Sequence, residues 1–434
     1  MSGLEIGFIS LGLMLVLIYS GLHVPIALAL SSFVGVWMIR GSSGLASKLI
    51  AIAAEESISS YIFGVVPLFV LMGLVVSEAG LGRDAFDVAS QTFGKIKGGL
   101  GVATVFANAI FAAITGISIA SAAIFTRIAV PEMRRSGYEP RFAVGIVAGS
   151  SVLGMLIPPS LLLILYGVLS EVSVGSLFLA GILPGILLSI AYALATIAMA
   201  YFWPSFVGKN LKSATEHIGP KAVVSKLFPI VLLIVLVLGG IYGGFFTPTE
   251  AGAIGAFAAI VIALAKGRLP LKALWKVAVE TGHITASICF LIISASMYSR
   301  MLALSGVPNF VGTWVTNAHL GIYGFIAIYV LITIIMGTIL DSSSIMLVLL
   351  PLVLPIAIQF GINLVWFGII TIIAIEIGLL TPPLGIAVYV IKGSLDDQSI
   401  SLNDIFAGAL PFAFIMLLVL IIIIAVPYLS LALI

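Results

Sequence analysis

Long apolar runs separated by short polar segments follow one another along the whole chain. Each run has the length and the scarcity of charge that a membrane-spanning helix needs. We therefore predict an all-α polytopic membrane protein. Its regular spans are expected near residues 5–22, 24–40, 60–77, 176–203, 227–243, 249–265, 281–299 and 404–430. The first run lacks a positively charged start and a small-residue cleavage site, so we expect a retained helix and no signal peptide.

Other apolar regions are less regular, because each has glycine, serine or proline near its middle; they cover residues 98–131, 141–170, 321–360 and 362–392. Inside lipid no water satisfies the backbone groups of a broken helix, so breaks occur only where protein or a polar cavity surrounds them. We predict two re-entrant helical hairpins and two broken helices. The hairpin tips are expected at 114–121 and 337–344, and the helix breaks at 149–160 and 376–385.

The two halves of the chain repeat this layout. Gly116 pairs with Gly337 at an offset of 221 residues, and Pro158 pairs with Pro382 at an offset of 224. The segment "AGILP" (180–184) matches "AGALP" (407–411) at an offset of 227. Internal symmetry of this kind is typical of many secondary transporters.

Charge indicates how the repeats are oriented. The turn "PEMRRSGYEPR" (131–141) has three arginines, whereas the matching turn "VLPIAIQFGIN" (353–363) has no charge. By the positive-inside rule the first turn is cytoplasmic and the second is not. We therefore predict inverted-topology repeats with both termini outside. Arg40 and Arg300 fall on the outer side as exceptions to the rule.

Polar segments divide the chain further. Residues 208–226 link the halves, and residues 266–276 are expected to form a short amphipathic helix at the membrane interface. We expect four regions, which are N-terminal scaffold helices (1–97), a first transport region (98–207), a linker with scaffold helices and an interfacial arm (208–299), and a second, inverted transport region (300–434).

The four breaks are the candidates for chemistry. Each frees carbonyl groups at the end of one helix and N–H groups at the start of the next. Carbonyls and Ser/Thr hydroxyls are hard ligands for a small cation such as Na⁺, whereas free N–H groups suit a carboxylate. The alternative is that these Gly-Pro kinks only aid helix packing. Four breaks in corresponding positions favour a binding site.

Ionisable residues in apolar segments are further candidates. Asp341 is expected either to bind a cation or to cap the helix that follows it. Glu376 is expected to face either the cavity or a partner helix. Arg300 is also a candidate to meet an anionic substrate, although an interface role is favoured. For the other polar residues of these segments we expect helix-end, surface or interhelical roles: Glu78, Glu250, Arg127 and Asn108.

Composition excludes several classes of protein. Hydrophobic residues make up 62% of the chain and charged residues 8%, and the net charge of +2 comes with no basic patch that would suit nucleic acid. The single cysteine, Cys289, provides no disulfide or zinc framework. The histidines lack metal-ligand spacing: His23, His217, His283 and His319. Because nucleotide-binding and hydrolase motifs are also absent, we expect neither an enzyme nor a cofactor.

A set of stretches occurs in the order and spacing of a known family: "PLFVLMGLVVSEAGL" (67–81), "ITGISIASAA" (114–123), "MRRSGYEPRFA" (133–143), "LGMLIPPSLLLILYG" (153–167), "FFTPTEAGAIGA" (245–256), "GTILDSSSIMLVLLPLVLPIA" (337–357) and "GLLTPPLGIAVYV" (378–390). Through them the chain resembles the large membrane subunit of a TRAP (tripartite ATP-independent periplasmic) transporter, within the ion transporter superfamily.

The resemblance implies a function and partners. A TRAP transporter would import an organic anion, such as a C4-dicarboxylate or sialic acid, across the bacterial inner membrane, coupled to a Na⁺ gradient. The hairpin-bearing regions would move as an elevator against the unbroken spans. A periplasmic substrate-binding protein would deliver the substrate. A small four-helix membrane subunit, encoded separately, would complete the scaffold.

The resemblance also implies site residues. The cation-binding positions would be Thr115, Gly116, Ser118, Ser121, Ser150, Gly154, Pro158, Gly337, Asp341, Ser342, Ser343, Thr381 and Pro382. The substrate would lie between them, at Ser151, Pro159, Ser160, Ser344 and Pro383.

Two other functions remain open on the sequence alone. A stand-alone Na⁺/dicarboxylate symporter of the same superfamily would need no binding protein. A channel would need charged rings or carbonyl filters in a closed oligomer, which two inverted halves in one chain do not favour. An intramembrane enzyme is a more distant alternative.

Overall fold

The computed structural model describes residues 1–434 except 60, 210, 212–218 and 398, and its regular secondary structure is helical throughout those residues. Within the described part, six helices are long and apolar enough to cross a membrane, or eight if each of two bent pairs is one span. The predicted all-α polytopic class is therefore confirmed. His217 and part of the predicted linker, residues 210 and 212–218, lie outside the described residues.

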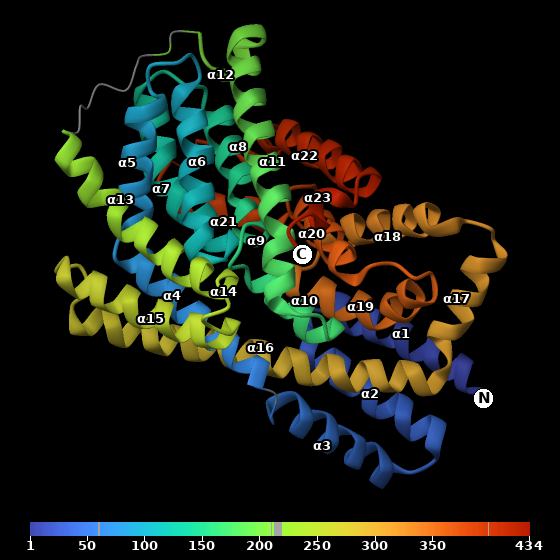
Figure 1. Ribbon diagram of the computed structural model, residues 1–434. Helices are drawn as coiled ribbons and strands as arrows, with labels where there is room; N and C mark the ends of the chain where they lie inside the picture. Colours follow the sequence, from blue (N-terminus) through green and yellow to red (C-terminus); the bar gives the residue numbers. More distant parts are fainter. Residues whose placement is uncertain (60, 210, 212–218, 398) are drawn as a thin grey trace.

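The N-terminal helices lead to the first hairpin (Figure 1). They are α1 (Gly3–Tyr19), α2 (Val24–Arg40), α3 (Ser43–Ser59), the short 3₁₀ helix η1 (Tyr61–Gly64), α4 (Val65–Glu78) and α5 (Leu81–Phe93). The first hairpin and the first broken helix follow as α6 (Gly99–Thr115), α7 (Ser118–Arg135), α8 (Pro140–Ser151), α9 (Leu153–Leu156) and α10 (Leu161–Ser170), and the half closes with α11 (Val174–Phe202) and α12 (Pro204–Val207).

The second half opens with outer helices and ends with the second hairpin and broken helix. The outer helices are α13 (Pro220–Ile234), the π-helical turn η2 (Val235–Gly239), α14 (Gly240–Tyr242), α15 (Pro248–Ala265) and α16 (Leu271–Ser305). The rest are α17 (Val307–Asn317), α18 (Gly321–Gly337), α19 (Ser342–Gln359), α20 (Leu364–Leu379), α21 (Ile386–Ser394), α22 (Leu402–Ala425) and α23 (Tyr428–Leu431). All four predicted breaks therefore separate helices.

One predicted element is wrong. Residues 266–276 were expected as a separate amphipathic helix, but the structure has one continuous helix, α16, from Leu271 to Ser305. Figure 1 shows α16 as the long gold helix that crosses the lower half of the view above α3, and it packs against α2, α3 and α4. No proline or glycine turn interrupts it, so the change from polar to apolar residues does not end the helix.

The broken elements form the buried centre of the molecule. α6, α8 and α20 are buried around most of their circumference, as expected of helices that are apolar on every side. The outer helices α13 and α16 bury a much smaller share of their residues. The structure thus surrounds α6, α8 and α20 with protein, as helices next to a break in a membrane require.

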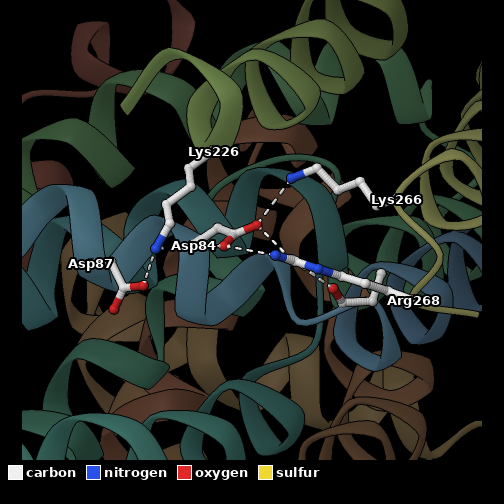
Figure 2. A network of polar contacts seen from close by, with 6 residues as sticks. Asp84, Asp87, Lys226, Lys266 and Arg268 are labelled. Atoms are coloured by element: carbon white, nitrogen blue, oxygen red, sulfur yellow. Dashed lines mark hydrogen bonds and ion pairs between the residues drawn. The ribbon is translucent and has the colours of Figure 1, made fainter. Parts of the chain in front are cut away.

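A charged cluster holds the bend between α4 and α5, which meet at 61°. The buried carboxylate of Asp84 accepts hydrogen bonds from Arg268 at 2.7 Å and Lys266 at 3.1 Å (Figure 2). Arg268 also donates to the Ala79 carbonyl at 3.1 Å, and Lys226 pairs with Asp87. These contacts tie α5 to α13 and to the loop between α15 and α16.

Candidate functional site

The tip of the first hairpin lies directly on the first helix break. Gly116 has φ of +63°, a left-handed conformation that turns the chain from α6 into α7. Its carbonyl accepts a hydrogen bond from the Leu161 N–H at 3.1 Å. A Cβ atom on Gly116 would lie only 2.3 Å from the Pro159 carbonyl oxygen, and one on Gly154 would lie 3.0 Å from the Ser118 nitrogen. Tip and break therefore fit together through main chain.

The second hairpin meets the second break in the same way. The Thr338 carbonyl accepts hydrogen bonds from the N–H groups of Leu384, at 3.1 Å, and Gly385, at 3.2 Å. Gly337 and Gly378 face each other, since a Cβ on Gly378 would lie 2.5 Å from the Gly337 Cα. In both halves, then, a hairpin-tip carbonyl pairs with the chain just after a Pro-Pro sequence.

In each half, a side-chain hydrogen bond also joins the first helix of the hairpin to the helix before the break. The Asn108 amide donates to the Ser150 hydroxyl at 2.7 Å, which joins α6 to α8. The Tyr329 and Thr371 hydroxyls bond at 2.9 Å, which joins α18 to α20. Both positions of the second pair lie 221 residues after those of the first. The interhelical role expected for Asn108 is confirmed.

Four of the predicted hydroxyl ligands also bond to a backbone carbonyl of their own helix. Thr115, Ser150, Ser151 and Thr381 each donate to a carbonyl of the preceding turn. A hydroxyl that donates keeps its lone pairs, so this bonding leaves the oxygen able to bind a cation. Ser121 is fully buried, and its hydroxyl has no hydrogen-bond partner among the described residues.

The two hairpins differ at the start of their second helices. Asp341 is the N-cap of α19, because its carboxylate accepts from the N–H groups of Ser343 and Ser344, both at 3.1 Å. The Ser344 hydroxyl also donates to Asp341. Of the two roles left open for Asp341, the geometry shows capping. In contrast, α7 starts after Ile117 without a side-chain cap, so its first-turn N–H groups remain available to an anion.

The breaks also differ in exposure. Pro158, Pro159 and Ser160 are buried, and Ser160 caps α10 through a bond from the Leu163 N–H at 3.3 Å. Pro382 and Pro383 are exposed, as is Leu384 after them. The first break is therefore covered by protein, whereas the second reaches the surface of this chain.

Glu376 lies between the two hairpin tips, although it was not among the site residues predicted from the sequence. Its carboxylate is 2% exposed and accepts a hydrogen bond from the Ser342 hydroxyl at 3.3 Å. The Ser118 hydroxyl faces the same carboxylate. Of the two roles left open for Glu376, the structure shows contact with partner helices, namely the second helices of both hairpins. Its place five residues before Pro-Pro in an apolar helix was the available sequence signal.

The remaining polar candidates have structural roles. Glu250 forms a capping box with Thr247 at the start of α15, as a helix-end residue was expected to do. Arg300 pairs with Glu56 of α3, which supports the interface role expected for it. His23 precedes α2 as its N-cap position without a side-chain bond. The described residues contain no cluster of three His, Cys, Asp or Glu side chains that would suit a metal.

A basic cavity of about 460 Å³ lies at the ends of α7 and α21 that are farthest from the hairpin tips and breaks. It is lined by α7 and by the end and following loop of α21, with Arg127, Arg134 and Arg135 on one wall and Asp396 and Asp397 on the other. Arg134 pairs with Asp397 across it. Hydrogen bonds from Ser399 and Arg134 lower the pKa of Asp397 to about 2. Both lining helices start at the tip or break described above, and the cavity lies at their opposite ends.

Comparison with known proteins identifies the family. The family described as "Tripartite ATP-independent periplasmic transporter, DctM component" matches residues 11–429. This chain belongs to the DctM family of TRAP transporters. The resemblance stated from the sequence motifs is thereby confirmed, and the protein is a multi-pass transporter permease.

Relatives and solved structures agree with this assignment. The chain is 35% identical to the C4-dicarboxylate TRAP transporter large permease protein DctM of Pseudomonas aeruginosa, over 89% of each chain. It is 31% identical to the sialic acid TRAP transporter large permease protein SiaM of Vibrio cholerae, over 85% of each. In fold it is similar to the Alcanivorax borkumensis YdaH transporter, with a TM-score of 0.62 at 15% identity, over 89% of this chain and 90% of that one.

Proposed function

We propose that this chain is the large permease subunit of a TRAP transporter that imports an organic anion, driven by a Na⁺ gradient. A C4-dicarboxylate or a sialic acid is the preferred substrate class, because relatives at 35% and 31% identity are named for these compounds. Both compounds carry carboxylates, which suit the uncapped N-terminus of α7.

One observation carries the proposal. Each hairpin tip bonds to the chain after a Pro-Pro break, and the two tips meet at the same buried carboxylate, Glu376. Broken helices with facing N-termini and freed carbonyls, in corresponding positions of two halves, are the arrangement that transporters use for ions and substrate. If the breaks only aided helix packing, there would be no reason for both hairpin tips to meet at one buried carboxylate.

The ion and substrate positions follow from the donor types. Cations would use carbonyls and hydroxyls where the first tip, Thr115–Ser121, meets residues 150–158, and where the second tip, Gly337–Ser343, meets Thr381 and Pro382. The substrate would lie between them, near Ser151, Pro159, Ser160, Ser344 and Pro383. We assign Asp341 chiefly to capping α19.

The transport motion would be an elevator of the two inverted repeats. The buried hairpins and broken helices would move together, while α1–α4 and α13–α16 would form the scaffold. Matching contacts at an offset of 221 residues and the similarity to solved transporters support this division. The basic cavity beside α7 would be the exit for the anion on the cytoplasmic side.

The proposed complex has two partners. A small four-helix membrane subunit would cover part of the exposed apolar surface, and a periplasmic binding protein would deliver the substrate at the outer face of the bacterial inner membrane. The tripartite nature of the family supports both.

Reconstitution in proteoliposomes tests the proposal. The chain together with its small subunit and binding protein should accumulate labelled C4-dicarboxylate or sialic acid only when an inward Na⁺ gradient is present, and an equal K⁺ gradient should not replace it. Uptake by the chain alone would instead indicate the stand-alone symporter. Single-channel currents in planar bilayers would indicate the channel.

A further inference from the structure

The carboxylate of Glu376 has no compensating positive charge near it. It takes part in no ion pair among the described residues, although it is 2% exposed and lies in a helix that is buried from Trp366 to Leu379. The helices that pack most closely on α20 carry no basic residue; α21, which contacts α20 less, has Lys392 at its far end, where it donates to the Ile400 carbonyl. An isolated charge in such a place is costly unless a counter-charge is supplied.

The partners of Glu376 are oxygens from both hairpins. Ser118 is the first residue of α7 and Ser342 is the first residue of α19; the Ser342 hydroxyl donates to this carboxylate at 3.3 Å, and the Ser118 hydroxyl faces it. Two further buried hydroxyls on α7 and α11 have oxygens without partners in the described residues. Ser121 lies one helical turn after Ser118, and Tyr192 lies within electrostatic range of Glu376; neither has a hydrogen-bond partner among the described residues.

We propose that Glu376, Ser118 and Ser342 form a binding site for one monovalent cation, Na⁺ in the cell, which joins the two hairpin tips. This inference deepens the proposed function and rests on it, since that function supplies the Na⁺ gradient. The ligands are hard oxygens, which favour an alkali cation over a soft metal. One carboxylate balances one positive charge, so a monovalent ion leaves no net charge in the buried centre.

The site has a consequence for coupling. Because its ligands come from α7, α19 and α20, the ion contacts both hairpins and the second broken helix together. An ion at the first break alone would contact only the first half. The ion at Glu376 therefore holds the two halves in one arrangement. When the ion dissociates, this stabilising contact between the halves is lost.

Thermal unfolding of the purified full-length chain tests this site without any transport step. NaCl, with KCl as the ionic-strength control, should raise the Tm of the wild type in a saturable way. Glu376→Gln keeps the size of the side chain and removes its charge, and we expect the half-saturating Na⁺ concentration to rise at least tenfold. Glu250→Gln is the matched control, because glutamine preserves the capping box at the start of α15.

The double variant Ser118→Ala/Ser342→Ala keeps the carboxylate and removes its partners, so it decides the question if Glu376→Gln fails to fold. We expect its half-saturating Na⁺ concentration to rise severalfold. Wild-type Na⁺ saturation in both variants would overturn the Glu376 site while leaving Na⁺-driven uptake intact. Absence of any Na⁺-specific shift or Na⁺-driven uptake in the wild type would overturn the proposed function as well.

Discussion

At the scale of single residues, adjacent side chains at the second hairpin tip have different roles. Asp341 accepts from two backbone N–H groups and one hydroxyl, so most of its acceptor capacity is used in starting α19. Ser342, the next residue, turns instead to Glu376. Adjacent polar residues at the second tip thus divide into a cap and a contact with the site.

Substitution of Asp341 separates these roles. Asn is also a good N-cap, so Asp341→Asn should keep both the stability of the protein and the Na⁺ dependence of uptake. Asp341→Ala should lower the free energy of unfolding by about 1 kcal/mol through loss of the cap. Chemical denaturation and Na⁺-dependent uptake of both variants measure this. A large loss of Na⁺ affinity in Asp341→Asn would show that the carboxylate is a cation ligand after all.

At the scale of helices, contact between hairpin and broken helix depends on the absence of side chains. α18 and α20 approach so closely at Gly337 and Gly378 that a Cβ on either would overlap main-chain atoms of the other helix. Such contacts give little room for repacking, because backbone cannot move aside as a side chain can.

Gly378→Ala should therefore destabilise the protein by about 1–3 kcal/mol and lower uptake, as overpacking does. Gly282→Ala in α16 is the control, since nothing lies within 4 Å of its new Cβ. We expect the control to be neutral or to stabilise the helix slightly. Equal melting temperatures for the two variants would contradict the close approach of α18 and α20.

The charged cluster at the α4–α5 bend provides a second test at this scale. Asp84→Ala would leave Lys266 and Arg268 without their buried carboxylate, and we expect a loss of about 3–5 kcal/mol in the free energy of unfolding. Asp87→Ala removes a more exposed partner of Lys226 and should cost about 1 kcal/mol or less. Denaturation of both variants measures the difference. Similar losses in the free energy of unfolding for the two variants would contradict the role of Asp84 as the buried carboxylate shared by Lys266 and Arg268 (Figure 2).

The ion pair across the basic cavity should not respond to physiological pH. The pKa of Asp397 is lowered to about 2, so its stabilising effect is complete above the ordinary pKa of an aspartate and is lost only as pH falls through about 2. Asp397→Asn should therefore shift the Tm by the same amount at every pH between 5 and 8. A difference that vanished at pH 5 would contradict the lowered pKa.

At the scale of the whole molecule, sequence patterns predicted the breaks better than the contacts between them. Glycine and proline act on the local backbone, so the four interruptions could be placed from residues such as Gly116 and Pro382. α5 was not predicted, because it is a charged amphipathic helix and carries no long apolar run. The meeting of Ser118 and Ser342 at Glu376 depends on the packing of the two halves, which no local pattern contains.

The central claim is that ions and substrate bind where the two hairpin tips meet the two helix breaks. The most direct measurement is a high-resolution cryo-EM map of the complex in NaCl with substrate, compared with one in KCl without it. We expect Na⁺-dependent density between each tip and its break and beside Glu376, with the anion near the start of α7. Density for ion and substrate elsewhere, with these positions unchanged between the two maps, would contradict the account.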